Sequence, residues 1–104
     1  MEPKEIYPNL IRLHVLIEAS RRPIDTGSVR GSLEDRGLIL NDASIRRILR
    51  EFEGKGYLAS SEAHNSRPHI IYTMTPAGRA RMRDAKEKIR ALIAMFESAG
   101  RYLK

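Results

Sequence analysis

The sequence predicts an α+β fold that is mainly helical, with three short helices, a β-hairpin and a long C-terminal helix. Three observations predict it. In the first half of the chain, apolar residues recur at intervals of three and four, which is the period of an amphipathic helix. Between Gly56 and Thr75 the pattern changes to β-branched and aromatic runs on either side of a polar segment. From Pro76 onward a helical pattern resumes, and nothing stops it before Gly100.

Length and composition narrow the possible functions. A chain of 104 residues fits one domain. Its net charge of +6 and pI of about 10.1 favour a polyanionic partner. The absence of cysteine excludes a disulfide scaffold, a Cys-ligated zinc finger and a thiol nucleophile. No apolar run approaches the roughly 20 residues of a membrane span, and the N-terminus has no apolar stretch of signal-peptide type. We therefore expect a soluble cytoplasmic protein with no membrane partner.

The first two helices are expected at about residues 9–20 and 27–35. Pro8 suits the first turn of the earlier helix, because the N–H that it lacks would have no partner there. Asp25 or Thr26 can act as the N-cap of the later one. Both helices carry apolar residues at helical spacing, so we expect them to pack against each other in the core.

A third helix, at about residues 43–53, carries an arginine-rich face. It follows Leu38-Ile39-Leu40, which is too short for a helix and is interpreted as a minimal strand. Asn41 or Asp42 can cap it. One side of this helix is an apolar stripe, made of Ile45, Ile48, Leu49 and Phe52. The other side is basic, and a short helix built this way suits insertion into a nucleic-acid groove. An ordinary solvated helix face is the alternative interpretation.

The second half of the chain reads as a hairpin followed by a long helix. Strands at about residues 57–61 and 69–74 flank a polar loop. Thr75 is a suitable N-cap for the helix that follows it. The apolar positions of that helix alternate three and four residues apart, as in a coiled-coil seam. We therefore expect dimerisation through Met82, Ala85, Ile89, Leu92 and Phe96, and packing of this stripe on its own domain is the alternative interpretation. The basic residues along the first half of this last helix are interpreted as a solvated face.

The predicted order is helix, helix, short strand, Arg-faced helix, hairpin and long helix, which is the plan of a winged helix-turn-helix. Residues 49–58 read LREFEGKGYL and resemble the L-x-x-L-E-x-x-G-L-I segment of PadR-like and MarR-like regulators. Residues 66–79 read SRPHIIYTMTPAGR and resemble the PadR wing, often G-R-P-R-K-Y-Y-x-L-T-P-x-G-R. The resemblance covers about residues 9–80. One departure is Arg46, where PadR-like proteins usually carry tyrosine.

This resemblance implies a prokaryotic transcriptional regulator that binds double-stranded DNA sequence-specifically as a homodimer. Residues 9–75 would form the winged-helix DNA-binding domain and 76–104 the C-terminal dimerisation helix, in one compact unit. The recognition helix 43–53 would enter the major groove, and the wing 57–74 would lie on the backbone or minor groove. The predicted DNA-binding residues are Asn41, Ala43, Ser44, Arg46, Arg47, Arg50, Asn65 and Arg67. Some relatives bind small-molecule effectors, so an unidentified effector is a possible partner; no cofactor or metal is expected. Such a protein would associate with the nucleoid when bound.

Two other classes of function are alternatives to this one. A winged helix can also bind RNA or a protein within a larger complex, since a fold does not settle function. A dimer that prefers a palindromic duplex would favour the regulator, and a monomer held on RNA or a protein would favour the alternative. An enzyme is not expected, because the sequence has no Ser/His/Asp constellation, no paired carboxylates and no Gly-rich phosphate loop. The histidines at 14, 64 and 69 fall in separate elements.

Overall fold

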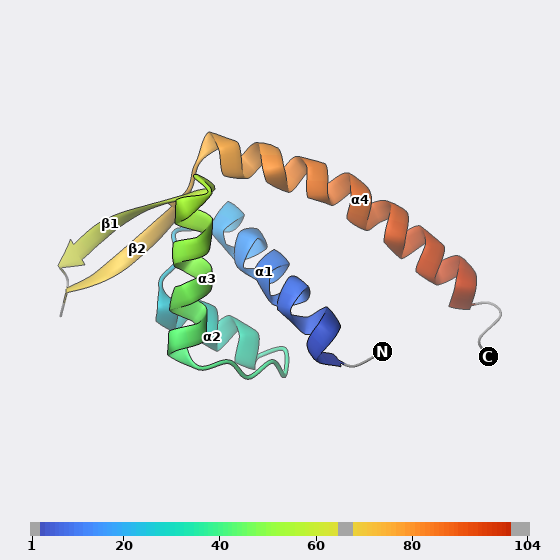
Figure 1. Ribbon diagram of the computed structural model, residues 1–104, viewed down its shortest axis with the longest axis horizontal. Coiled ribbons are helices and arrows are strands. Elements are labelled where there is room, and N and C mark those ends of the chain that lie inside the picture. The colour runs from blue at the N-terminus through green and yellow to red at the C-terminus, as the bar shows by residue number, and fades with distance from the viewer. Residues whose placement is uncertain (1–2, 65–67, 101–104) are drawn as a thin grey trace.

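The computed structural model describes residues 3–64 and 68–100, without the side chains of residues 3–8 and 64. Three helices pack together, a two-stranded antiparallel hairpin projects from one side of them, and the last helix runs away on the other side (Figure 1). This arrangement confirms the predicted α+β, mainly helical fold. The elements are α1 (Pro3–Arg21), α2 (Thr26–Glu34), α3 (Asp42–Gly54), β1 (Leu58–His64), β2 (Pro68–Met74) and α4 (Pro76–Gly100).

The first helix is longer than its sequence pattern indicates. α1 begins at Pro3 and continues through Pro8, so the prediction that the helix starts after Pro8 is wrong. A proline inside a helix removes one backbone hydrogen bond, but here the turn before it stays helical. The buried side of α1 lies in its second half, where Val15 is fully buried and Leu16 and Ala19 nearly so.

The core lies between α1, α2 and α3 and is closed by the base of the hairpin. Its largest fully buried side chains are Val15, Ile24, Val29, Leu33, Ile45, Leu49 and Leu58. Ile24 and Tyr72 exchange two backbone hydrogen bonds, at 2.9 and 2.8 Å, which ties the α1–α2 connection to β2. The minimal strand predicted at residues 38–40 does not form, because these residues lead as irregular backbone into the cap of α3. Ile24, through its bridge to Tyr72, is the residue that pairs with the edge of the hairpin instead.

Capping and one ion pair fix α2 against α3. Asp25 and Ser28 form a capping box at the start of α2, with the Ser28 N–H donating to Asp25 Oδ1 at 2.7 Å. The Asn41 side chain caps α3 by accepting from the Ser44 N–H at 2.8 Å. Arg30 of α2 binds Asp42 in the first turn of α3 at 2.5 Å. These contacts hold the first turn of α3 against α2.

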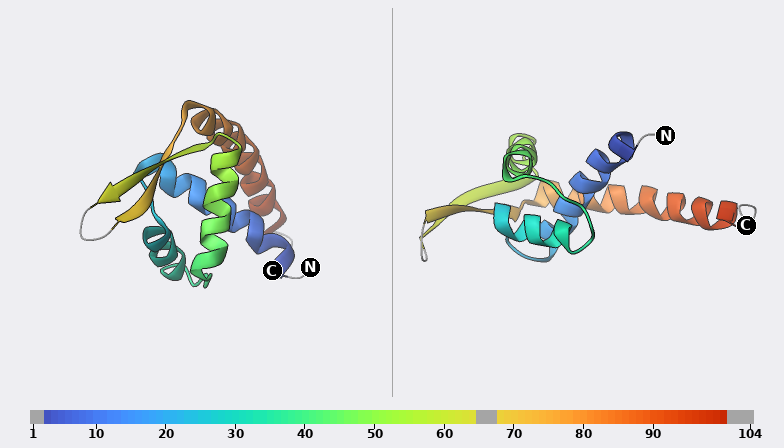
Figure 2. Two further views of the ribbon diagram at one scale, coloured as in Figure 1. Left: turned by 60° about the vertical axis from the view of Figure 1, so that its left-hand side comes forward. Right: turned by 90° about the horizontal axis from the view of Figure 1, so that it is seen from below.

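The hairpin is longer than predicted and is anchored at its base. β1 and β2 pair from Leu58 opposite Met74 to His64 opposite Pro68, so residues expected in the loop belong to the strands. Leu58 is buried at the base, whereas Ile70 near the tip is 50% exposed. The Glu53 carboxylate at the end of α3 accepts a hydrogen bond from the Ser60 hydroxyl of β1. The hairpin therefore emerges directly beside the C-terminal end of α3 (Figure 2).

The junction between β2 and α4 is built around Thr75 and Gly78. The Thr75 N–H donates to the Tyr57 carbonyl at 3.0 Å, and its hydroxyl donates to the Gly56 carbonyl at 2.5 Å. The same hydroxyl accepts from the Gly78 N–H at 3.0 Å, which caps α4 as predicted. A Cβ added at Gly78 would clash with the Tyr57 carbonyl and lie 3.0 Å from Met74 Cγ. Glycine is thus required by the close approach of two backbones.

Two glycine-to-alanine substitutions test this junction. Gly78→Ala should destabilise the protein by about 1–3 kcal/mol, as overpacking in a rigid site does. Gly31, inside α2, has no atom within 4 Å of an added Cβ, so Gly31→Ala should stabilise by about 0.5–1 kcal/mol. Urea unfolding of both variants measures the difference. A Gly78→Ala protein as stable as the parent would show that the junction is not closely packed.

The last helix packs on its own domain only through its first half. Met82 contacts the core and Ala85 and Ile89 are half-buried, but Leu92 and Phe96 are 59% and 75% exposed. The apolar stripe predicted as one seam is therefore divided, since Met82 serves the protein's own core. The described chain is elongated, at 53 × 28 × 20 Å, because α4 extends past the other elements. No helix in the described residues has the length and apolar character that a membrane span requires.

Candidate nucleic-acid interface

The outer face of α3 is basic and its inner face is apolar. Arg46, Arg47 and Arg50 are exposed, while the stripe from Ile45 to Phe52 is buried. Within the described part of the chain, none of these three arginines forms an ion pair with a carboxylate. Three guanidinium groups on one short helix, with no acid neutralising them, attract a polyanion.

The acidic side chains of α3 are instead paired with residues of neighbouring elements. Asp42 pairs with Arg30 of α2, and Glu53 is hydrogen-bonded to Ser60 of β1. Glu51 receives two bonds from Arg12 of α1, at 2.8 Å to Oε2 and 3.2 Å to Oε1. These bonds lower the pKa of Glu51 below its usual value, so the carboxylate stays ionised and paired. Each acid therefore anchors α3 to a neighbour and leaves the outer face to arginine.

A groove of about 590 Å³ separates the outer face of α3 from the hairpin and the start of α2. It is lined by Asp25, Thr26, Gly27, Arg46, Pro68, His69, Ile70 and Tyr72. His69 Nε2 lies 3.5 Å from Asp25 Oδ2 across this groove. Burial raises the pKa of the Tyr72 hydroxyl, with Glu53 acting in the same direction and Arg50 against it. Arg46 and Arg50 thus lie on the side of α3 that faces the hairpin.

Comparison with known families identifies this architecture. The family described as winged helix DNA-binding domain matches residues 13–93, which is most of the chain. The chain belongs to this family. In a winged-helix domain, α3 is the recognition helix and the β1–β2 hairpin is the wing. The basic face of α3 and the groove beside it therefore lie where a winged-helix domain binds DNA.

Solved structures share the fold at low sequence identity. A PadR family transcriptional regulator from Eggerthella lenta is 24% identical with a TM-score of 0.78, over 96% of this chain and 87% of that one. A PadR family transcription regulator from Clostridium difficile is 13% identical with a TM-score of 0.78, over 85% and 95%. Bacillus subtilis PadR, solved in complex with operator DNA, is 11% identical with a TM-score of 0.64, over 72% of this chain and 45% of that chain. Comparison with curated proteins finds no match.

The winged-helix structure places most of the predicted DNA-binding residues on one surface. Ala43 is exposed beside the arginines, and Ser44 is half-buried. Asn41 acts first as the cap of the recognition helix, so its side-chain oxygen and the Ser44 N–H are already bound to each other. Asn65 and Arg67, predicted at the wing tip, lie outside the described residues. Thr26 and Gly27 line the groove beside the wing without being among the predicted residues, although the capping-box sequence around Asp25 marks the same helix start.

One histidine, His14, connects two helices of the winged-helix domain. His14 Nε2 lies 2.9 Å from the Ser32 hydroxyl, joining α1 to α2. Burial lowers the pKa of His14, with the nearby Arg36 acting in the same direction and Glu18 against it, so the neutral ring is favoured. Among the residues that the structure describes, no group of three histidine or acidic side chains is placed to hold a metal ion.

Proposed function

We propose that this winged-helix protein is a PadR-like transcriptional regulator that binds double-stranded DNA sequence-specifically as a homodimer. The observation that carries the proposal is the set of unpaired arginines at 46, 47 and 50 on a recognition helix whose acids are all engaged elsewhere. In the major groove, arginine can bind guanine O6 and N7 through two hydrogen bonds at once. Such a regulator works in the prokaryotic cytoplasm, on the nucleoid, without a catalytic role.

The other contacts hold the domain on the duplex. The remaining N–H groups at the start of α3, with Ser44, would contact phosphate, as helix N-termini commonly do. The wing, with Asn65 and Arg67 at its tip, would reach the backbone or the minor groove. Arg46, Arg47 and Arg50 lie on the exposed face of α3 between these two contacts, and Arg46 also lines the groove beside the wing. We expect these arginines to read bases while the flanks bind phosphate.

Exposed apolar side chains support a homodimer. Leu10 and Leu13 of α1 lie with Leu92, Ile93 and Phe96 of α4 along an open apolar groove of about 780 Å³. Leu10 is 46% exposed and Phe96 75%, which is a large apolar surface for a monomer in water. A second copy related by a two-fold axis would cover it. Two recognition helices related this way require a near-palindromic operator.

Selection of bound duplexes from a random DNA pool tests the proposal. We expect a shared motif with two-fold symmetry, because each subunit presents the same face. The affinity for the selected duplex should fall steeply as salt rises, since arginine contacts to phosphate release counterions. A pool without a shared motif, or an affinity that does not depend on salt, would contradict the proposal. A monomer that prefers RNA over the selected duplex would favour the alternative function.

A further inference from the structure

A histidine of the wing lies against the acid that caps α2. His69 of β2 and Asp25, directly before α2, are 3.5 Å apart between Nε2 and Oδ2. Their side chains are 34% and 35% exposed, so solvent protons and a polyanion can both reach the pair. Arg46 of the recognition helix lines the same groove. The His69–Asp25 pair therefore belongs to the surface that we propose binds DNA.

The start of α2 holds the Asp25 carboxylate in place. Its Oδ1 accepts from the Ser28 N–H at 2.7 Å, and the Ser28 hydroxyl accepts from the Asp25 N–H at 3.0 Å. Oδ2 is the oxygen that faces His69. The neighbouring Ile24 is bridged to Tyr72, three residues from His69 along β2. The wing is thus attached to the start of α2 at two points, by the backbone bridge and by the His69–Asp25 pair.

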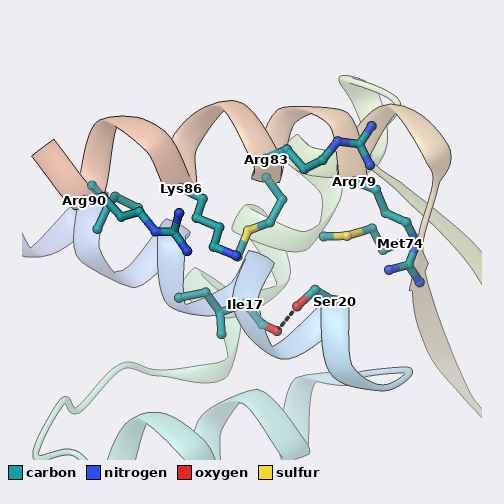
Figure 3. Close-up of a pocket in the computed structure, with 9 residues that line it drawn as sticks. Ile17, Ser20, Met74, Arg79, Arg83, Lys86 and Arg90 are labelled. Carbon is teal, nitrogen blue, oxygen red and sulfur yellow. Dashed lines mark hydrogen bonds between the residues drawn. The ribbon is translucent and has the colours of Figure 1, made fainter.

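A carboxylate in this groove needs a partner if the groove is to face DNA. The groove between α1 and α4 shows the contrast, because four cations and, among the described residues, no acid line it (Figure 3). Beside the wing, the negative charge of Asp25 repels phosphates unless a cation neutralises it. Arg30 lies near Asp25, but its guanidinium binds Asp42 at 2.5 Å. Protonated His69 is the cation that the structure places on Asp25.

The groups around His69 come from three elements besides its own strand neighbours. Asp25 lies at the start of α2, and Arg46 comes from α3. On β1, Glu62 lies one register position from the residue opposite His69. Burial raises the pKa of the Tyr72 hydroxyl, so this group stays neutral. Histidine is the side chain that changes charge between about pH 5 and 8, so a pH change in that range acts on this groove through its histidine.

We propose that Asp25 positions His69 on the wing and that the protein binds a duplex more tightly when His69 is protonated. The imidazolium neutralises Asp25 and attracts phosphate, so duplex binding takes up a proton from solvent. Because binding and protonation then favour each other, the affinity for DNA rises as the pH falls from about 8 to 6. This role of His69 rests on the proposed DNA binding, since the duplex is the ligand.

Fluorescence anisotropy with the selected duplex tests this role on the intact chain. The ionic strength is kept constant, because salt alone changes the affinity for DNA. We expect the affinity of the parent to rise at least about fivefold between pH 8 and pH 6, the lower end of usual coupling between two ligands. His69→Gln should remove most of this rise, since glutamine does not take up the proton. A thermal melt of each variant checks that it is folded.

Asp25→Asn distinguishes a positioning role from simple packing. Asparagine is an equally good N-cap, so α2 keeps its capping bond. Without the carboxylate, the variant should bind the duplex more tightly than the parent at about pH 8 and gain less on acidification. A contact that only supports the structure would instead weaken binding when it is lost. Weaker binding of folded Asp25→Asn at that pH therefore overturns the role of Asp25.

The controls replace the other two of the chain's three histidines. His14 joins α1 to α2, and His64 ends β1. His14→Gln and His64→Gln should both keep the pH response of the parent. A response that His69→Gln keeps, or a duplex affinity that does not change with pH, overturns the role of His69 and leaves the regulator standing. A parent that binds no duplex at any pH overturns the proposed function as well, so the two failures are distinguishable.

Discussion

Replacing Arg46 and Arg47 together with alanine should abolish specific DNA binding while leaving the fold intact. Both side chains are exposed and lie off the buried stripe of α3, so their loss removes no core contact. A well-placed arginine–guanine pair contributes about 1–3 kcal/mol, so losing two should cost at least about 30-fold in affinity. Fluorescence anisotropy with the selected duplex measures the loss, and thermal unfolding measures the fold.

That experiment must distinguish the effect of losing two positive charges from the effect of where those charges lie. Arg81→Ala with Lys88→Ala also removes two positive charges, but from α4, where Asp84 already pairs with both. This control should lose little affinity for the selected duplex. If it loses as much as the α3 variant, the protein binds DNA through its overall charge and α3 does not read the sequence. An unchanged affinity of the Arg46/Arg47 variant would remove the basis of the proposed function.

Leu92→Glu with Phe96→Glu should convert the proposed dimer into monomers. Both side chains are largely exposed in the single chain, so a folded monomer tolerates the charges. In a dimer they would be buried without partners, which is strongly unfavourable. Light scattering coupled to size exclusion should give a mass near the 11.9 kDa of one chain, against twice that for the parent. The variant should also bind a palindromic duplex more weakly, because the two half-sites are no longer linked.

A matched control places two acids on the same turns of α4. Ala91 and Ala94 are exposed and lie on the other side of the helix from Leu92 and Phe96. Ala91→Glu with Ala94→Glu should remain dimeric, since these residues are outside the proposed seam. A variant at 92 and 96 that is still dimeric would place the interface elsewhere. Ile89 is a poorer site for this test, because it is half-buried against its own chain.

Short sequence patterns predicted the features that depend on residues close together in the chain. The stripe of α3 is buried as its spacing indicates, and Asn41 caps the helix. Thr75 caps α4, and Pro76 is its first residue. Each of these features depends on residues within one or two turns of each other, so the sequence itself contains the interaction. The candidate DNA-binding face followed for the same reason, because helical spacing alone separates the arginines from the core.

Contacts between distant segments could not be predicted. The bridge between Ile24 and Tyr72 involves one residue on each side, which leaves no periodic signal. The bonds from Arg12 to Glu51 span 39 positions and depend on how α1 crosses α3. The stripe of α4 is continuous in sequence, and only packing shows that Met82 serves the core while Phe96 does not.

The junction at Thr75 and Gly78 has a mechanical consequence. α4 extends as a lever of about 38 Å, since its 25 residues each rise about 1.5 Å. A rotation of about 10° at this junction would move the C-terminal end of α4 by roughly 7 Å, which is about two base-pair steps along DNA. In the proposed dimer, the spacing of the two recognition helices depends on that angle. The stiffness of this short hinge would thus set how strictly the protein measures the distance between half-sites.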